Sequence, residues 1–151
     1  MRAVMWNVLA HEETHKKLLT EIRSANLSRP YPTWKEIIEL PYLDACINEA
    51  IRIHPSFCLP LERIVPAGGI TISGHFLEEG TVVGMNPYVV NRDRETYGED
   101  ADDWRPERWM GISEEQWRKM DGNILTVSIH TTNFICTVSL DLHLISISEL
   151  R

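Results

Sequence analysis

Apolar residues recur at helical spacing over the first two dozen positions of the chain. Charged Lys16, Lys17 and Glu21 occupy the opposite face at the same period. An apolar stripe opposite a charged face is typical of an amphipathic helix that packs on a core. We therefore predict a helix from Arg2 to about Ser24, with a break near His11. The apolar positions are Val4, Met5, Val8, Leu9, Leu18, Leu19 and Ile22.

Prolines divide the next part of the chain. The stretch SRPYPTWKEIIELP predicts a loop that contains a short helical turn over Trp34 to Leu40. Pro41 suits the first turn of a second long helix. This helix must end before Pro55, because the residue before a proline avoids helical dihedral angles. We therefore predict the second helix from Pro41 to His54.

Two short β segments follow. Ile70 to Ser73 and Thr81 to Met85 have strand-like composition and are separated by Gly74 and Gly80. The acidic stretch NRDRETYGEDADDWRPERW predicts an ordered surface loop that ends in aromatic residues. The fold class that results is mainly α with small β segments.

The character of the chain changes at Gly122. From there charged residues nearly vanish, β-branched residues crowd together, and no turn residues divide ILTVSIHTTNFICTVSLDLHLISIS. We predict a division into residues 1–121, which form part of a globular domain, and residues 122–151, a tail of different character.

Composition limits the classes of partner. The chain has 151 residues and a formal net charge of −7, which argues against nucleic acid as a partner. Three widely spaced cysteines suggest no disulfide framework, so we expect an intracellular protein. The opening MRAVMWNVLAHEETHKK meets charge too early for a secretory signal. The longest uncharged run, 123–140, is too polar to favour a membrane anchor.

The sequence HEETH matches the pattern of zinc peptidases. On a helix, His11 and His15 would lie one turn apart and Glu12 would act as general base. The extended form of the motif fails, because Leu18 and Glu21 occupy the positions of its glycine and third histidine. A downstream glutamate is left as a candidate third ligand. Two solvated histidines at a break in a helix are the better interpretation.

A charged pair lies within the apolar second helix. Glu49 and Arg52, in DACINEAIRIHPS, are three residues apart and therefore share one face with Leu43, Ile47 and Ile51. An unpaired charge there would be costly, so the two residues need each other and a third charge. The alternative is an exposed helix pair that contributes only about 0.2 to 0.5 kcal/mol.

The surrounding motifs resemble those of the cytochrome P450 superfamily of heme-thiolate monooxygenases. EAIR at 49–52 is followed by IHPS, by LPLER and, after the acidic loop, by RPERW. The similarity runs from about Arg2 to Asp121, and ELPYLDACINEAIRIHP with LPLERIVPAGG most resembles fungal members of the pisatin demethylase type. The resemblance implies a partial chain from the C-terminal half of this fold. It would hold the helices up to and including the K helix, short strands and the meander loop.

The resemblance implies a structural triad. Glu49 and Arg52 match the family's K-helix pair, and Arg108 in RPERW matches the arginine that completes it. One carboxylate held by two guanidiniums forms charge-assisted, partly bidentate hydrogen bonds that fix helix to loop behind the cofactor. We therefore expect a clamp, and no catalytic acid or base, at these residues.

The resemblance also implies contacts with heme and substrate. Arg63 in LPLER matches an arginine that contacts a heme propionate, and a surface arginine is the alternative interpretation. Leu59, Pro60 and Leu61 match the segment that lines the substrate pocket. The implied cofactor is heme. The implied partners are a hydrophobic small-molecule substrate, O2 and an NADPH-dependent reductase.

The resemblance fails at the loop that holds the iron. The family's axial cysteine lies in a Phe-x-x-Gly-x-Arg-x-Cys-x-Gly loop, and its thiolate donates electron density that favours cleavage of O2. Cys136 does not fit this loop, so we expect no axial ligand in this chain. The required Phe, Gly, Arg and Gly positions are occupied by Ile129, Thr132, Phe134 and Val138.

We interpret the tail from about Val127 as translated intron. MDGNILT still suits the family's approach to its heme loop, and Val127 stands at the position of the loop's phenylalanine. The common splice-donor sequence GTAAGT encodes Val-Ser in frame, and Val127 is followed by Ser128. A genuine divergent C-terminus with two or three β segments is the alternative.

The expected function follows from the resemblance. The parent protein would insert one oxygen atom of O2 into a hydrophobic organic substrate at a heme iron, on the cytosolic face of the endoplasmic reticulum membrane. The present chain would be an inactive fragment of it. Two alternatives stay open: a zinc metallopeptidase that uses His11, Glu12 and His15, and a non-catalytic interaction domain.

Overall fold

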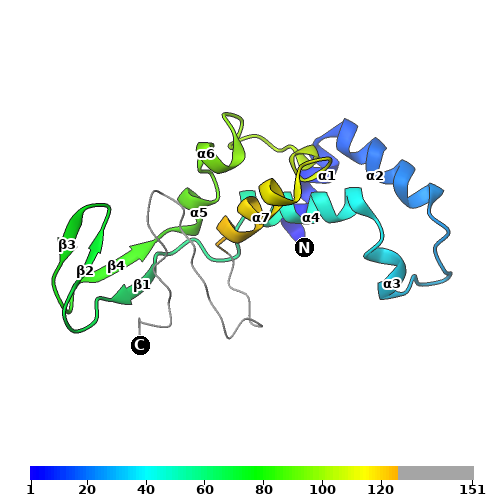
Figure 1. Ribbon diagram of the computed structural model, residues 1–151. Coiled ribbons are helices and arrows are strands. Elements are labelled where there is room, and N and C mark those ends of the chain that lie inside the picture. Colours follow the sequence, from blue (N-terminus) through cyan, green and yellow to red (C-terminus); the bar gives the residue numbers. More distant parts are fainter. Residues whose placement is uncertain (126–151) are drawn as a thin grey trace.

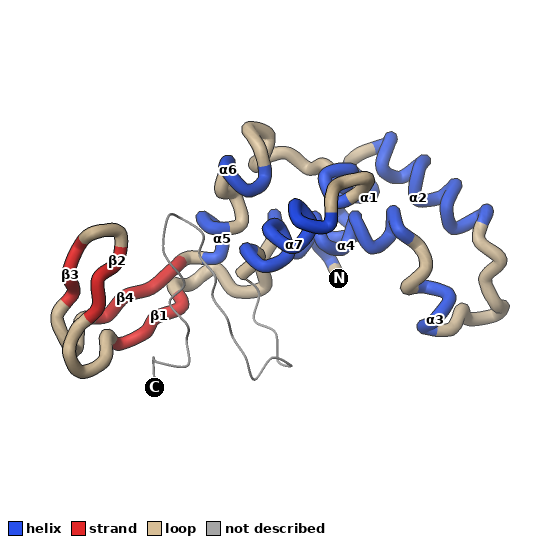
Figure 2. The backbone as a smooth tube through the Cα atoms, in the orientation of Figure 1, coloured by secondary structure: helices blue, strands red, loops and turns tan. Residues whose placement is uncertain are grey.

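The structure is a computed structural model that describes residues 1–125. Long helices occupy one end of the molecule and two small strand pairs occupy the other (Figures 1 and 2). The prediction of a mainly α chain with small β segments is confirmed. The predictions that concern Val127 and Cys136 lie outside the described residues.

The first predicted helix is two helices. α1 (Arg2–Ala10) and α2 (Glu12–Ser24) meet at His11, whose φ of −113° and ψ of 99° are extended. The break therefore lies where the sequence predicted it. Glu12 and Glu13 form the first turn of α2, where their negative charge interacts favourably with the helix dipole.

Two further helices follow the proline-rich loop. α3 (Trp34–Ile37) is a single turn that begins with a capping box between Thr33 and Glu36. α4 (Pro41–Ile53) starts at Pro41, as predicted, and ends one residue before the predicted boundary. The carboxylate of Glu21 on α2 caps this helix, because it accepts the first backbone N–H groups of α4 at 2.7 and 2.9 Å.

Four strands form two antiparallel pairs. β1 (Leu61–Ile64) pairs with β4 (Val82–Met85), and β2 (Ile70–Ile72) pairs with β3 (His75–Leu77). The second pair turns at Ser73 and Gly74, both with positive φ, as in a two-residue hairpin loop. The sequence predicted β2 and β4. It did not predict β1 and β3.

Short helical turns lie within the acidic surface loop and next to it. These are α5 (Pro87–Val90) just before it, α6 (Arg94–Tyr97) within it and the 3-10 turn η1 (Pro106–Trp109) at its end. α7 (Glu114–Asn123) follows and was not predicted. Only Met120 of this polar helix is buried, so the sequence shows no apolar stripe.

α4 is the central helix of the core. Its Tyr42 and Cys46 pack with Val8 of α1, and its Ala45 packs with the group Tyr97, Ala101, Trp109 and Met120. α4 therefore joins the N-terminal helices to the acidic loop. None of the helices within residues 1–125 has the length and apolarity needed to cross a membrane.

Candidate functional site: a buried carboxylate between two arginines

Glu49 is the centre of a buried polar cluster. Its side chain, on the face of α4 that meets η1, is 0% exposed. Oε1 accepts hydrogen bonds from Arg52 Nη2 at 2.8 Å, the Arg105 backbone N–H at 3.0 Å and Arg108 Nε at 2.9 Å. Oε2 accepts from Arg52 Nε and from the indole N–H of Trp109, both at 2.9 Å. We call these five residues the Glu49 cluster.

Arg52 uses all five of its N–H groups. Two donate to Glu49 in a bidentate pair. The other three donate to main-chain carbonyls: Nη1 to Asn91 at 2.9 Å and to Ala101 at 2.6 Å, and Nη2 to Asp103 at 3.3 Å. Arg52 is 0% exposed, so these acceptors replace the water that its guanidinium loses on burial.

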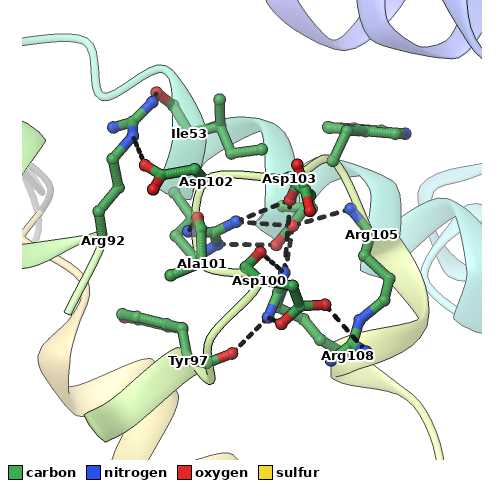
Figure 3. Close-up of polar contacts among 12 residues, drawn as sticks. Ile53, Arg92, Tyr97, Asp100, Ala101, Asp102, Asp103, Arg105 and Arg108 are labelled. Carbon is green, nitrogen blue, oxygen red and sulfur yellow. Dashed lines mark hydrogen bonds and ion pairs between the residues drawn. The ribbon is translucent and has the colours of Figure 1, made fainter. Parts of the chain in front are cut away.

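Arg108 donates hydrogen bonds to further main-chain carbonyls of the same loop. Its Nε donates to Glu49, and its Nη groups donate to the carbonyls of Tyr97, of Asp100 at 2.8 Å and of Asp103 at 3.3 Å (Figure 3). The loop between α6 and η1 has little regular structure, so its buried carbonyls need partners from elsewhere. The two guanidiniums supply them and thereby hold the loop against α4.

Asp100 balances the charge of the cluster. One carboxylate and two guanidiniums would leave an excess positive charge in the core. The Asp100 carboxylate lies 3.3 Å from Arg108 and 2.9 Å from Arg105, and its side chain is 31% exposed. It therefore extends the network from the buried centre to the surface.

The surroundings keep Glu49 ionised. Burial by itself would raise the pKa of this carboxyl, but the hydrogen bonds and charge of Arg52, the charge of Arg108 and the Trp109 indole outweigh it, and the pKa lies below its usual range. A general acid or base needs a pKa near the working pH. Glu49 is thus suited to hold two arginines and unsuited to transfer a proton at neutral pH.

A comparison with known families identifies the chain. The family model described as Cytochrome P450 matches residues 1–124. The chain belongs to the cytochrome P450 family. The match includes α4, the strand pairs, the acidic loop and η1. The Glu49 cluster is therefore a feature of a cytochrome P450 chain.

Fungal cytochrome P450 monooxygenases are similar over the same region. The monooxygenase mfmA of Annulohypoxylon moriforme is 58% identical over 126 residues, which are 83% of this chain and 24% of the relative. The monooxygenase pkfB of Emericella nidulans is 55% identical over 127 residues, 83% of this chain and 25% of the relative. The monooxygenase mpaDE of Penicillium roqueforti is 52% identical over 130 residues, 83% of this chain and 15% of the relative. The chain thus spans a quarter or less of the length of these relatives.

The residues proposed to contact heme and substrate lie after α4, at the start of β1 and just before it. In this cytochrome P450 chain Arg63 stands on β1 opposite Val83, with its side chain exposed and Nη1 2.7 Å from the Glu62 carbonyl. Leu59 is 63% exposed, Pro60 is exposed, and Leu61 is half-buried at the start of β1. A guanidinium beside an exposed apolar stretch has the chemistry to meet a propionate and a hydrophobic molecule.

The two cysteines within residues 1–125 lie in different environments. Cys46 is 0% exposed in the helical core, and burial raises the pKa of its thiol to about 12. The exposed Cys58 lies with its sulfur 3.5 Å from the Pro55 carbonyl. Cys46 is therefore a core residue whose thiol stays protonated at neutral pH.

The HEETH motif does not form the helical site that a zinc peptidase needs. His11 precedes α2, its ring stacks on Trp104 at 6.0 Å, and its Nδ1 lies 2.8 Å from the Asn7 carbonyl. His15 is exposed on α2. Among residues 1–125, no three His, Cys, Asp or Glu side chains are grouped to hold a metal ion.

Proposed function

We propose that this chain forms part of a heme-dependent monooxygenase. The parent enzyme would insert one oxygen atom of O2 into a hydrophobic substrate, with two electrons from a reductase and two protons reducing the other atom to water. The observation that carries the proposal is the Glu49 cluster, in which one carboxylate with no exposed surface holds Arg52 of the same helix and Arg108, which lies 59 residues further along the chain than Glu49. The fungal relatives are named monooxygenases, which supports the same reaction class.

The residues of this chain would have three different roles. Glu49, Arg52 and Arg108 would fix α4 to the acidic loop. Arg63 would bind a heme propionate through its guanidinium. The segment Leu59 to Leu61 would line the substrate pocket. Heme, when bound through a cysteine thiolate, supplies the activation of O2.

Finer assignments rest on the resemblance of motifs. We propose that the parent enzyme is of the fungal pisatin demethylase type and receives electrons from an NADPH-dependent reductase at the cytosolic face of the endoplasmic reticulum membrane. The 151-residue chain alone would be inactive, because Cys136 lacks the motif of the family's ligand loop.

A chimera tests the proposed function. We expect that residues 1–124, placed in the matching segment of the Annulohypoxylon relative, will give a reduced carbon monoxide complex with the red-shifted Soret band of thiolate ligation. The relative would supply the cysteine loop, and this chain would supply the clamp and Arg63. The 151-residue chain with added heme is the control and should lack this band. A folded chimera without the band would contradict the proposal.

The tail forms a separate proposal. We propose that residues from about Val127 are translated intron, and the end of the family match at residue 124 supports a change of origin near this point. Sequencing of the transcript across codons 120 to 151, together with the genomic DNA beyond, tests it. We expect a spliced message that continues into the cysteine loop. A dominant message that encodes this tail, with no such reading frame downstream, would refute the intron.

A further inference from the structure

Arg92, which is not part of the Glu49 cluster, caps the C-terminal end of α4. It lies between α5 and α6, and its Nη2 donates to the carbonyl of Ile53, the last residue of α4, at 2.8 Å (Figure 3). Nη1 donates to the Tyr88 carbonyl at 3.1 Å, and Nε lies 3.4 Å from an Asp102 carboxylate oxygen. The Arg92 side chain is only 14% exposed, so these contacts hold it in one place.

The contacts of Arg92 require a guanidinium. Its central carbon lies 3.8 Å from the centre of the Tyr88 ring, which gives a stacked cation–π contact. Its nitrogens at the same time reach two carbonyls and one carboxylate. A planar fork can point in these directions together, whereas the single ammonium of lysine cannot. A cation at this place also interacts favourably with the C-terminal end of the helix dipole.

The chain changes direction next to this contact. The final hydrogen bond of α4 joins the His54 N–H to the Ala50 carbonyl at 2.9 Å, and His54 then leaves helical geometry with φ −122° and ψ 70°. Buried Pro55 follows, and the chain runs on to Leu59 and the strand β1. The carbonyl that Arg92 holds therefore belongs to the last residue of α4, six positions before the segment proposed to line the substrate pocket.

We propose that Arg92 is a positioning residue for this segment. By holding the Ile53 carbonyl against α5 and the acidic loop, it sets the direction in which the chain leaves α4, and so the place of Leu59 to Leu61 relative to a bound ligand. The inference rests on the proposed function, because the direction of the chain after α4 affects ligand binding only if Leu59 to Leu61 line the substrate pocket. The Glu49 cluster fixes the body of α4, whereas Arg92 fixes its exit.

Hydrogen–deuterium exchange in the full 151-residue chain tests the local effect. Arg92→Gln should speed exchange about tenfold at the hydrogen-bonded amides on either side of this segment, those of His54 and of β1, and leave residues 41–49 unchanged. Arg94→Gln is the matched control: Arg94 is 61% exposed, reaches the same Asp102 at 3.8 Å and donates to Glu99 of the acidic loop at 3.3 Å. Unchanged exchange at His54 and in β1, or equal acceleration there and across residues 41–49, would overturn the positioning role.

Ligand binding in the chimera tests the consequence. Imidazole probes the iron alone, whereas 4-phenylimidazole also needs the pocket wall, so Arg92→Gln should weaken 4-phenylimidazole about three- to tenfold and leave imidazole unchanged. Arg92→Lys should behave like Arg92→Gln, since a lysine keeps the charge but cannot make all the hydrogen bonds of the planar guanidinium at once. Equal changes for both probes, or full recovery by lysine, would overturn the proposal. A chimera without thiolate ligation would instead refute the proposed function, while the exchange result still decides the role of Arg92.

Discussion

Replacing Glu49 by glutamine should destabilise the chain by about 3 to 5 kcal/mol, the cost of leaving a buried charge without its partner. The variant keeps the shape of the side chain but leaves Arg52 and Arg108 without a buried counter-charge. Such a loss is large against a total stability of about 5 to 15 kcal/mol. Urea unfolding of the full chain, followed by circular dichroism, measures the difference in free energy of unfolding.

Glu107→Gln is the matched control for this prediction. Glu107 also pairs with a cation, Lys17, and accepts from the Tyr42 hydroxyl at 3.0 Å, but its side chain is 40% exposed. An exposed pair is worth about 1 kcal/mol or less, so this variant should unfold at nearly the urea concentration of the parent. If both variants lost the same small amount of stability, burial of Glu49 would not have the energetic role assigned to it.

Acidification should remove the same stabilisation without a mutation. The folded pKa of Glu49 lies below its usual range: burial opposes the shift, and the hydrogen bonds and charges of the two arginines outweigh burial. A group whose pKa is lowered by folding stabilises the protein above its unfolded pKa, which is about 4.3 for glutamate. That contribution is lost as the pH falls from about 4 through the lowered folded pKa, because the unfolded chain then binds more protons.

Urea unfolding between pH 7 and pH 3 measures this dependence. The free energy of unfolding of the parent chain should fall steeply below about pH 4. Glu49→Gln lacks the titrating carboxyl and should show a shallower fall, so that the two curves converge in acid. Curves that stay parallel would show that Glu49 does not titrate with a lowered pKa.

Local sequence patterns predicted the helices that bury an apolar stripe of side chains. The break at His11 and the start of α4 at Pro41 follow from spacing and proline stereochemistry. α7 was missed because it is held by its cap and by polar contacts, with Ser113 accepting from the Gln116 N–H at 3.2 Å. Strand β1 was missed because its pairing with β4 depends on residues about twenty positions away, which a local pattern does not contain.

The site was predictable only where side-chain chemistry is visible in sequence. The spacing of Glu49 and Arg52 on an apolar face indicated that a third charge was needed, and Arg108 lies 2.9 Å from the carboxylate. Main-chain acceptors such as the Ala101 carbonyl carry no sequence signal, because every residue has one. The carbonyl contacts of Arg92 were missed for the same reason.

A double-mutant cycle on Glu49 and Arg108 tests most directly whether one buried carboxylate holds both segments together. Glu49→Gln, Arg108→Leu and the combined variant are compared with the parent chain by urea unfolding. If the two residues belong to one network, removing both costs much less than the sum of the single losses, and we expect a coupling energy of about 2 kcal/mol or more. Losses that add to within about 0.5 kcal/mol would contradict a shared network.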